Sequence, residues 1–300
     1  MTDNDGQWER GLIEKLATAA LKEQRRARRW GIFWKLLTFA YVTVVLVMAV
    51  DWQGGVDSKS GSKHTALVDI KGVIGPGTDA SADKVTLALQ SAFKDKNTQG
   101  VVLRINSPGG SPVQSQSIYD EMRRLRKAYP ATPLYVVVED LCASGGYYVA
   151  AAADRIYVAK GSIVGSIGVR MDGFGVVGLM EKLGVERRLI TAGTNKALLD
   201  PFLPEDPAHK QIAVGLVDEI HKQFIGAVRE GRGKRLKETP DMFSGLIWTG
   251  AKSIELGLTD GLGTLDSVAR DVIKAEDIVD YTQKDNIAEK LARRFGAGAM

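Results

Sequence analysis

The sequence predicts an α/β domain preceded by a single N-terminal transmembrane helix. Short apolar runs at 65–70, 101–105 and 134–138 are typical of buried strands, since they are brief and contain β-branched residues. Helix-prone stretches at 80–93 and 113–128 separate these runs, so strand and helix alternate as in α/β folds. Further strands are expected at 155–158, 163–169 and 187–191, and further helices at 149–153, 177–183 and 208–230. Neither a repeat nor a break divides residues 64–282, which we expect to form one domain.

The composition narrows the classes of function. The 300 residues carry a formal net charge of +4, largely near the N-terminus, which argues against a nucleic-acid-binding protein. A single cysteine, Cys142, excludes a disulfide within the chain and a zinc cage of clustered Cys and His. We expect His64 at the edge of a linker and His209 and His221 on a solvated helix face. No phosphate loop, metal-ligand cluster or acidic pair stands out, so we expect no cofactor and no metal.

The N-terminal region reads as a membrane anchor. Residues 30–50 are long and apolar enough to span a bilayer, and their one charged residue, Lys35, lies near an end where its amine can reach the headgroups. The basic cluster before the span predicts a cytoplasmic segment at 1–29. A cleaved signal peptide is the alternative, because residues 47–49 end in a small-residue pattern, but the long basic region favours an uncleaved anchor. The Gly/Ser-rich residues 51–63 form a linker.

A serine stands on a corner between the apolar run 134–138 and the helix that follows. The segment 141–148 reads Leu-Cys-Ala-Ser-Gly-Gly-Tyr-Tyr, and the two glycines behind Ser144 allow the backbone to turn sharply. Amides at the start of a helix face whatever lies above the serine, as an acyl-transfer nucleophile with part of an oxyanion hole requires. A plain packing turn explains the octapeptide equally well, so other segments must decide.

A second glycine corner follows the strand expected at 101–105. Residues 106–110 read Asn-Ser-Pro-Gly-Gly. These glycines also fit a simple turn, but an open Pro-Gly-Gly corner after a buried strand presents backbone amides, as an oxyanion hole requires.

Together with these two corners, three further segments resemble the signal peptide peptidase A family of membrane-anchored bacterial serine peptidases. The matching segments are 104–111, 142–148, 161–169, 191–196 with 201–202, and 249–252 with 256–263. Each piece alone is weak, but their order and spacing are specific, and the similarity covers roughly residues 65–280. The departures, Cys142 and Asn106, stand where the family varies and leave the catalytic pattern intact.

The resemblance implies a Clp-protease/crotonase-like fold with a Ser-Lys dyad. By position, Ser144 would be the nucleophile and Lys196 the general base. The amides of Gly110 and Gly145 would form the oxyanion hole, and Ser166 would be hydrogen-bonded to the lysine amine. The chain length matches the short form of the family, whose members assemble as closed rings or domes, so the resemblance also implies a homo-oligomer, most simply of eight subunits.

Lys196 can act as a base only if its amine is neutral, which depends on the pKa of that amine. A lysine amine has a reference pKa of about 10.4, so roughly one in a thousand is neutral at neutral pH, and burial lowers that pKa. The neighbours Leu189, Ile190 and 197–199 are suited to burying it. An exposed loop lysine is the alternative, but the spacing to Ser144 favours the base. Cys142 is a rival nucleophile, although a buried apolar cysteine before the corner explains it adequately.

The function expected from the sequence is a membrane-anchored serine endopeptidase. The implied substrates are remnant signal peptides, and the domain at 64–282 would lie outside the cytoplasm, on a bacterial inner membrane. A polar tail is expected at 283–300. The alternatives are a broader membrane-associated peptidase of protein fragments, a crotonase-type acyl-CoA enzyme, and an inactive membrane scaffold.

Overall fold

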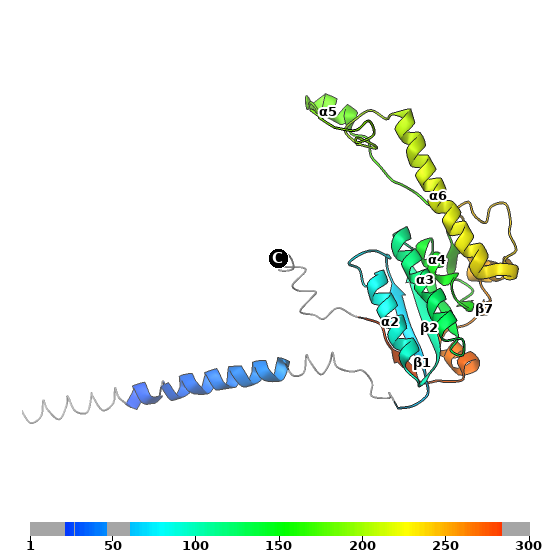
Figure 1. The fold of residues 1–300 in the computed structure, drawn as a ribbon. Coiled ribbons are helices and arrows are strands. Elements are labelled where there is room, and N and C mark those ends of the chain that lie inside the picture. The colour runs from blue at the N-terminus through cyan, green and yellow to red at the C-terminus, as the bar shows by residue number, and fades with distance from the viewer. Residues whose placement is uncertain (1–21, 27, 47–60, 284–300) are drawn as a thin grey trace, which may run out of the picture. The chain divides into compact units, whose positions relative to one another are not determined.

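The structure, a computed structural model, describes residues 22–26, 28–46 and 61–283. The chain divides into two units, residues 1–56 and 57–300. In the first unit, the helix Lys22–Leu46 is long and apolar enough to cross a membrane, and it is the one such helix in the described ranges (Figure 1). Residues 47–50 of the expected span, most of the linker and all but the start of the expected tail lie outside these ranges.

The second unit contains an eight-stranded sheet whose order along its main path is β6-β5-β3-β2-β1-β8. Its strands are β1 His64–Lys71, β2 Thr98–Ser107, β3 Leu134–Ala143, β4 Arg155–Val158, β5 Ile163–Gly165, β6 Ile247–Thr249, β7 Gly261–Leu262 and β8 Ile278–Asp280. The first half of β3 pairs with β4 and its second half with β5, while β7 pairs with β4. All neighbours are parallel except the antiparallel pair of β5 and β6. The carboxyl ends of β2 and β3 therefore meet at one edge.

Helices follow the strands and cover the sheet. They are α2 Ala82–Lys94, α3 Pro112–Ala128, α4 Gly145–Ala150, α5 Val177–Leu183, α6 Pro207–Arg232, α7 Gly250–Glu255 and α8 Leu265–Ser267, with a 3₁₀ helix at Gly233–Arg235 and a π-helix at Val268–Ile273. In Figure 1, α2 and α3 lie side by side across one face of the sheet. Ser111 caps α3, since its side chain accepts a hydrogen bond from the amide of Gln114.

The main core lies between the sheet and this helical layer. Alternate residues of β1, β2 and β3 point into it, where they pack against buried residues of the helices, among them Leu89, Ile118 and Met122. A smaller cluster of Val102, Val137, Tyr157 and Val268 lies apart from the main one. Both groups are buried on folding, which supplies most of the driving force for the fold.

The α/β class and the first three strands are confirmed, and three local predictions differ from the structure. The strand expected at 163–169 ends at Gly165, because Gly165 and Ser166 have positive φ angles that break the extended conformation. The strand expected at 187–191 does not form: this segment pairs with no described strand, and Ile190 is 97% exposed. The helix expected at 149–153 instead begins at Gly145 and ends at Ala150, as α4. Residues 151–153 follow it as a buried turn.

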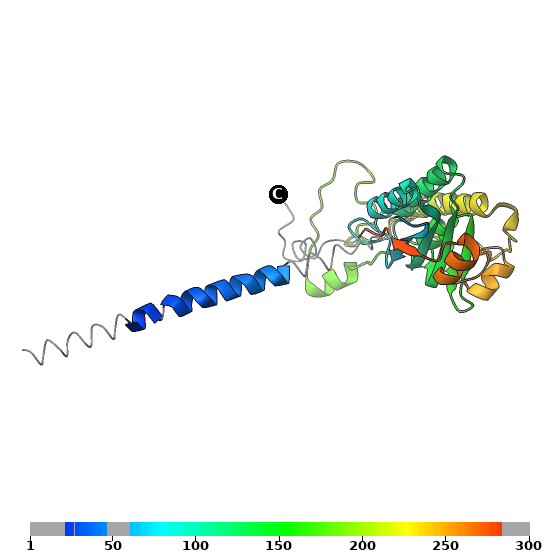
Figure 2. The same ribbon diagram turned by 90° about the horizontal axis from the view of Figure 1, so that it is seen from below.

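Residues 170–206, here called the arm, leave the sheet after β5 and return through α6. Figures 1 and 2 both show α5 well away from the sheet, and in Figure 1 it lies beyond the N-terminal end of α6. No residue of α5 is buried, and the buried residues of α6 all lie in its C-terminal third. The arm has contacts of its own, including an ion pair of 2.7 Å between Arg187 and Asp200.

Candidate active site

Ser144 stands at the turn from β3 into α4 in a strained conformation. Its φ of 52° and ψ of −124° are unusual for a residue with a side chain. Two backbone bonds fix it there: its amide donates to Gly165 O at 2.8 Å, and its carbonyl accepts from the amide of Tyr148 at 2.9 Å. Ser144 lines a cavity of about 620 Å³. The sheet and α4 together thus hold the serine at the wall of a cavity, as a nucleophile requires.

The glycine corner at 109–110 packs directly against the one at Ser144. A Cβ on Gly109 would lie 2.5 Å from the amide nitrogen of Gly145, and a Cβ on Gly110 would lie 2.0 Å from Ile74 O. Only glycine fits at either position, because Gly109 lies against the Ser144 corner and Gly110 lies against the backbone of Ile74.

The backbone amides of Gly110 and Gly145 do not donate to the described hydrogen bonds that join these two corners to the neighbouring segments. The bridge between Ile74 and Gly110 uses the carbonyl of Gly109 and the amide of Ser111, not the amide of Gly110. The first hydrogen bond across the start of α4 is donated by Tyr148, so the amide of Gly145 precedes it. Both residues line the same cavity as Ser144. Two backbone donors beside a serine can stabilise the oxyanion of an acyl transfer.

Ser166 directly follows β5, the strand that pairs with the end of β3 before Ser144. It has a φ of 53°, and its amide donates to Leu246 O at 2.7 Å, which holds the turn after β5. Ser166 lines the cavity together with Ser144. The structure therefore brings together four of the five residues that the sequence singled out: Ser144, Gly110, Gly145 and Ser166.

Lys196 is the fifth, and it lies in the arm. Lys196 is exposed, and it is not among the residues that line the Ser144 cavity. Leu189 and Ile190, from which we expected burial of the amine, are themselves exposed. Within the described part of a single chain, the lysine and the serine are therefore not brought to one cavity.

The other polar candidates do not supply a base or a rival nucleophile. Cys142 is fully buried, and burial raises the pKa of its thiol, so it remains protonated. His221 lies outside the cavity lining, with Nε2 3.2 Å from Ile167 O. His64 lies where the linker ends, as the first residue of β1, and it is completely buried: its Nδ1 lies 2.9 Å from Ser62 O and its Nε2 3.1 Å from the Tyr281 hydroxyl.

Part of the cavity wall was missed by sequence reasoning. The rings of Tyr148 and Phe224 pack with centroids 5.0 Å apart, and both line the cavity. Phe224 comes from α6, eighty residues after the corner, so nothing local in the sequence indicates it. Ser115 of α3 also lines the cavity and is fully buried.

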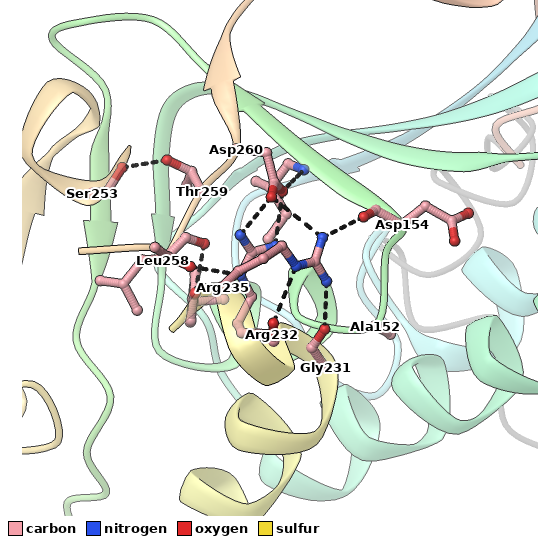
Figure 3. Close-up of polar contacts among 12 residues, drawn as sticks. Ala152, Asp154, Gly231, Arg232, Arg235, Ser253, Leu258, Thr259 and Asp260 are labelled. Atoms are coloured by element: carbon pink, nitrogen blue, oxygen red, sulfur yellow. Dashed lines mark hydrogen bonds and ion pairs between the residues drawn. The ribbon is translucent and has the colours of Figure 1, made fainter. Parts of the chain in front are cut away.

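A buried ion pair between Arg232 and Asp260 lies close to a hydrogen bond that holds α4. Arg232, at the end of α6, donates to both carboxylate oxygens of Asp260 at 2.8 and 2.9 Å (Figure 3). Burial alone would raise the pKa of Asp260, but the hydrogen bonds and charge of Arg232 outweigh it, so that pKa lies below its ordinary value. Two residues before Asp260, the carbonyl of Leu258 accepts from the Tyr147 hydroxyl at 2.7 Å. These contacts thus tie residues 258–260 to the helix that begins at the Ser144 corner.

Comparison with known proteins gives two family matches. The sequence model of peptidase family S49 matches residues 127–278 of the chain, and that of the Clp protease family matches residues 67–160. The Clp protease match covers β1 to β4 and both glycine corners, in agreement with the expected fold class.

Individual relatives are similar over about two thirds of the chain. A Brucella abortus protein named Na(+)/H(+) antiporter NhaA is 46% identical over 209 residues, which are 68% of this chain and 28% of that protein. A Synechocystis relative, provisionally named a protease, is 33% identical over 67% of this chain and 70% of its own length. An Enterococcus faecium relative, provisionally named signal peptide peptidase SppA, is 30% identical over 65% and 56%. The chain spans little more than a quarter of the Brucella protein, so most of that antiporter lies outside the match.

Proposed function

This chain belongs to peptidase family S49, and on that premise we propose that it is a serine endopeptidase with Ser144 as its nucleophile. The observation that carries the proposal is the strained Ser144 corner, which shares one cavity with the amides of Gly110 and Gly145. Ser144 Oγ attacks the peptide carbonyl carbon, and its proton passes to a base. The two amides hold the resulting oxyanion, and the base protonates the leaving amine as the C–N bond breaks. Water, which the base deprotonates, then attacks the acyl group, and the bond to Ser144 Oγ breaks with return of the proton to the serine. The aromatic pair Tyr148 and Phe224 favours an apolar substrate side chain.

The general base in this proposal is the neutral amine of Lys196, hydrogen-bonded to Ser166. Because Lys196 lies in the exposed arm and outside the Ser144 cavity, the dyad is completed between two copies of the chain. Large apolar side chains support this arrangement, since the arm leaves them exposed and a neighbouring copy would cover them. They include Phe174 (86% exposed), Leu183 (68%) and Ile190 (97%). A homo-oligomer follows, and the family resemblance favours a closed ring or dome of eight.

The proposed substrates are remnant signal peptides at the membrane. The helix Lys22–Leu46 supports an anchor by its length and composition, and the basic residues before the apolar stretch favour a cytoplasmic N-terminus. The organisation is then a cytoplasmic segment (1–29), a span (30–50), a linker (51–63), an extracytoplasmic peptidase domain (64–282) and a tail (283–300), on a bacterial inner membrane. An anchor concentrates the site where apolar peptides reside. A broader action on membrane-protein fragments is the alternative.

Covalent labelling tests the nucleophile. The full chain, purified in a mild detergent, is treated with an alkyl fluorophosphonate, and the modified peptide is identified by mass spectrometry. Reaction confined to Ser144, and lost in Ser144→Ala, is the expected result. A chain that does not react would favour an acyl-CoA enzyme or a scaffold, and reaction at Cys142 would contradict the assignment of the serine.

A further inference from the structure

A buried hydroxyl beside the proposed oxyanion hole has no hydrogen-bond partner. Ser115 lies in the first turn of α3 and is fully buried, and its Oγ makes no hydrogen bond within the described part of the chain. Ser117, in the same helix, instead donates to Val113 O at 2.9 Å, as helical serines commonly do. Buried polar groups without a partner are rare and destabilising, so the hydroxyl of Ser115 is not explained by the stability of α3.

The Ser115 hydroxyl packs against the backbone of Gly145. A Cβ on Gly145 would lie 2.4 Å from Ser115 Oγ and 3.2 Å from the amide nitrogen of Gly110. The hydroxyl and the Gly110 amide therefore approach the same point beside the Gly145 Cα. All three residues line the Ser144 cavity. Ser115 thus occupies the space that a side chain at 145 would need.

We propose that Ser115 is a positioning residue of the oxyanion hole that acts through the backbone of Gly145, an inference that rests on the proposed function. A glycine has no side chain to fix its peptide planes, yet an oxyanion hole needs donors held in place before the reaction. The contact from α3 supplies that restraint from outside the residue. Removal of the hydroxyl leaves the Gly145 peptide room to move, and its amide then meets the oxyanion less well.

The restraint matters at one stage of the reaction. The amide of Gly145 meets negative charge only once the oxyanion forms, so a restraint that holds this amide in place lowers the barrier of the chemical step. The same restraint adds no contact to the unreacted substrate, so substrate binding is unchanged.

The test compares Ser115→Ala with Ser117→Ala in the full, detergent-purified chain. Fluorophosphonate reaction is followed to give a maximal rate and a half-saturating concentration. For Ser115→Ala we expect a maximal rate lower by about tenfold, less than the loss of a direct oxyanion donor. Its half-saturating concentration should not change, and its melting temperature should stay equal or rise, because an unpaired buried hydroxyl is removed. Ser117→Ala should match the unsubstituted chain in rate.

Two further comparisons of variants distinguish a positioning role of the Ser115 hydroxyl from simple packing of its side chain. Ser115→Thr keeps the hydroxyl and Ser115→Val replaces it with a methyl in the same shape, so the Thr variant should react faster. Gly145→Ala should slow the reaction more in the unsubstituted chain than in Ser115→Ala, where the clashing oxygen is gone.

Several results would overturn this inference. They are a Ser115→Ala rate equal to that of Ser117→Ala, equal rates for the Thr and Val variants, and a slower rate that simply follows a lower melting temperature. Failure of the unsubstituted chain to react at all is a different result, since it removes the nucleophile assignment on which the inference rests.

Discussion

Ser144 and Lys196, the two members of the proposed dyad, lie in regions of contrasting construction. Ser144 is held in a positive-φ conformation by β5 and α4, and a side chain at Gly109 or Gly110 would clash with neighbouring backbone. Lys196 lies in the arm, where α5 has no buried residue and Ile190 is 97% exposed. The contrast teaches that a single chain assembles the proposed nucleophile and oxyanion hole, whereas the proposed base, Lys196, depends on what covers the arm.

The contrast separates two kinds of substitution. Side chains added at Gly109 or Gly110 would strain a packed site, so we expect such changes to lower stability and activity together. Changes in the arm alter activity or assembly and leave the unfolding of the domain unchanged, because few of its side chains are buried in a single chain.

The largest effect that the arm can produce is expected at Lys196. Arg keeps the charge but cannot accept a proton at these pH values, so Lys196→Arg should lower peptide hydrolysis by about a thousandfold, as far as Lys196→Ala. Lys182, an exposed lysine of α5, provides the control, and Lys182→Arg should retain full activity. Hydrolysis of a fluorogenic peptide measures both variants. Substantial activity in Lys196→Arg would assign the base to another group.

The corresponding change in the packed region is Gly110→Ala. Its added methyl would lie 2.0 Å from Ile74 O at a φ of +152°, so we expect a loss of unfolding free energy of about 3 kcal/mol or failure to fold. Gly72 has a φ of +79° with nothing near its would-be Cβ, and Gly72→Ala should show only the smaller cost of the backbone conformation. Chemical denaturation compares the two, and equal destabilisation would show that the glycine corner is not sterically fixed.

A third prediction concerns the buried ion pair between Arg232 and Asp260. Asp260→Asn leaves the buried Arg232 without its carboxylate and should lower the unfolding free energy by about 3 kcal/mol, whereas Glu255→Gln, in an exposed pair with Lys252, should change it little. The folded pKa of Asp260 is depressed, so its stabilisation is present above the unfolded pKa of about 3.9 and is lost as the pH falls through the lower folded pKa. The difference between wild type and Asp260→Asn should therefore shrink only in that acidic range. A constant difference down to pH 2 would contradict the assigned charge.

The smallest effect on the fold is expected at the tip of the arm. Ile190→Ser should leave the denaturation midpoint unchanged, because the side chain is 97% exposed in a single chain. It should shift the sedimenting species toward smaller assemblies, whereas Leu87→Ser on α2, also exposed, should not. Sedimentation velocity distinguishes these outcomes, and an unchanged assembly would remove Ile190 from the interface.

The sequence predicted the features that local pattern determines. The apolar runs of β1, β2 and β3 and the helices between them follow from periodicity, and the glycines at 109–110 and 145–146 marked the two corners before any geometry was known. Cys142 likewise behaves as expected, since burial explains it.

The rest depends on contacts between distant segments. The run at 187–191 has the composition of a strand but lies where no described strand can pair with it. The burial of His64 depends on Tyr281, more than two hundred residues away, and the role of Ser115 depends on its contact with Gly145 across α3 and α4. Neither contact leaves a trace in the local pattern of residues.

Complementation between two inactive variants tests the central claim most directly. Ser144→Ala and Lys196→Ala chains are each inactive in the proposed mechanism. When they are dissociated, mixed and reassembled, some sites combine the intact Ser144 of one copy with the intact Lys196 of its neighbour. Recovery of peptide hydrolysis in the mixture, to about a quarter of the wild-type value for random pairing, is the predicted result. A mixture as inactive as its components, in particles of the same size as wild type, would show that the dyad is not formed between copies.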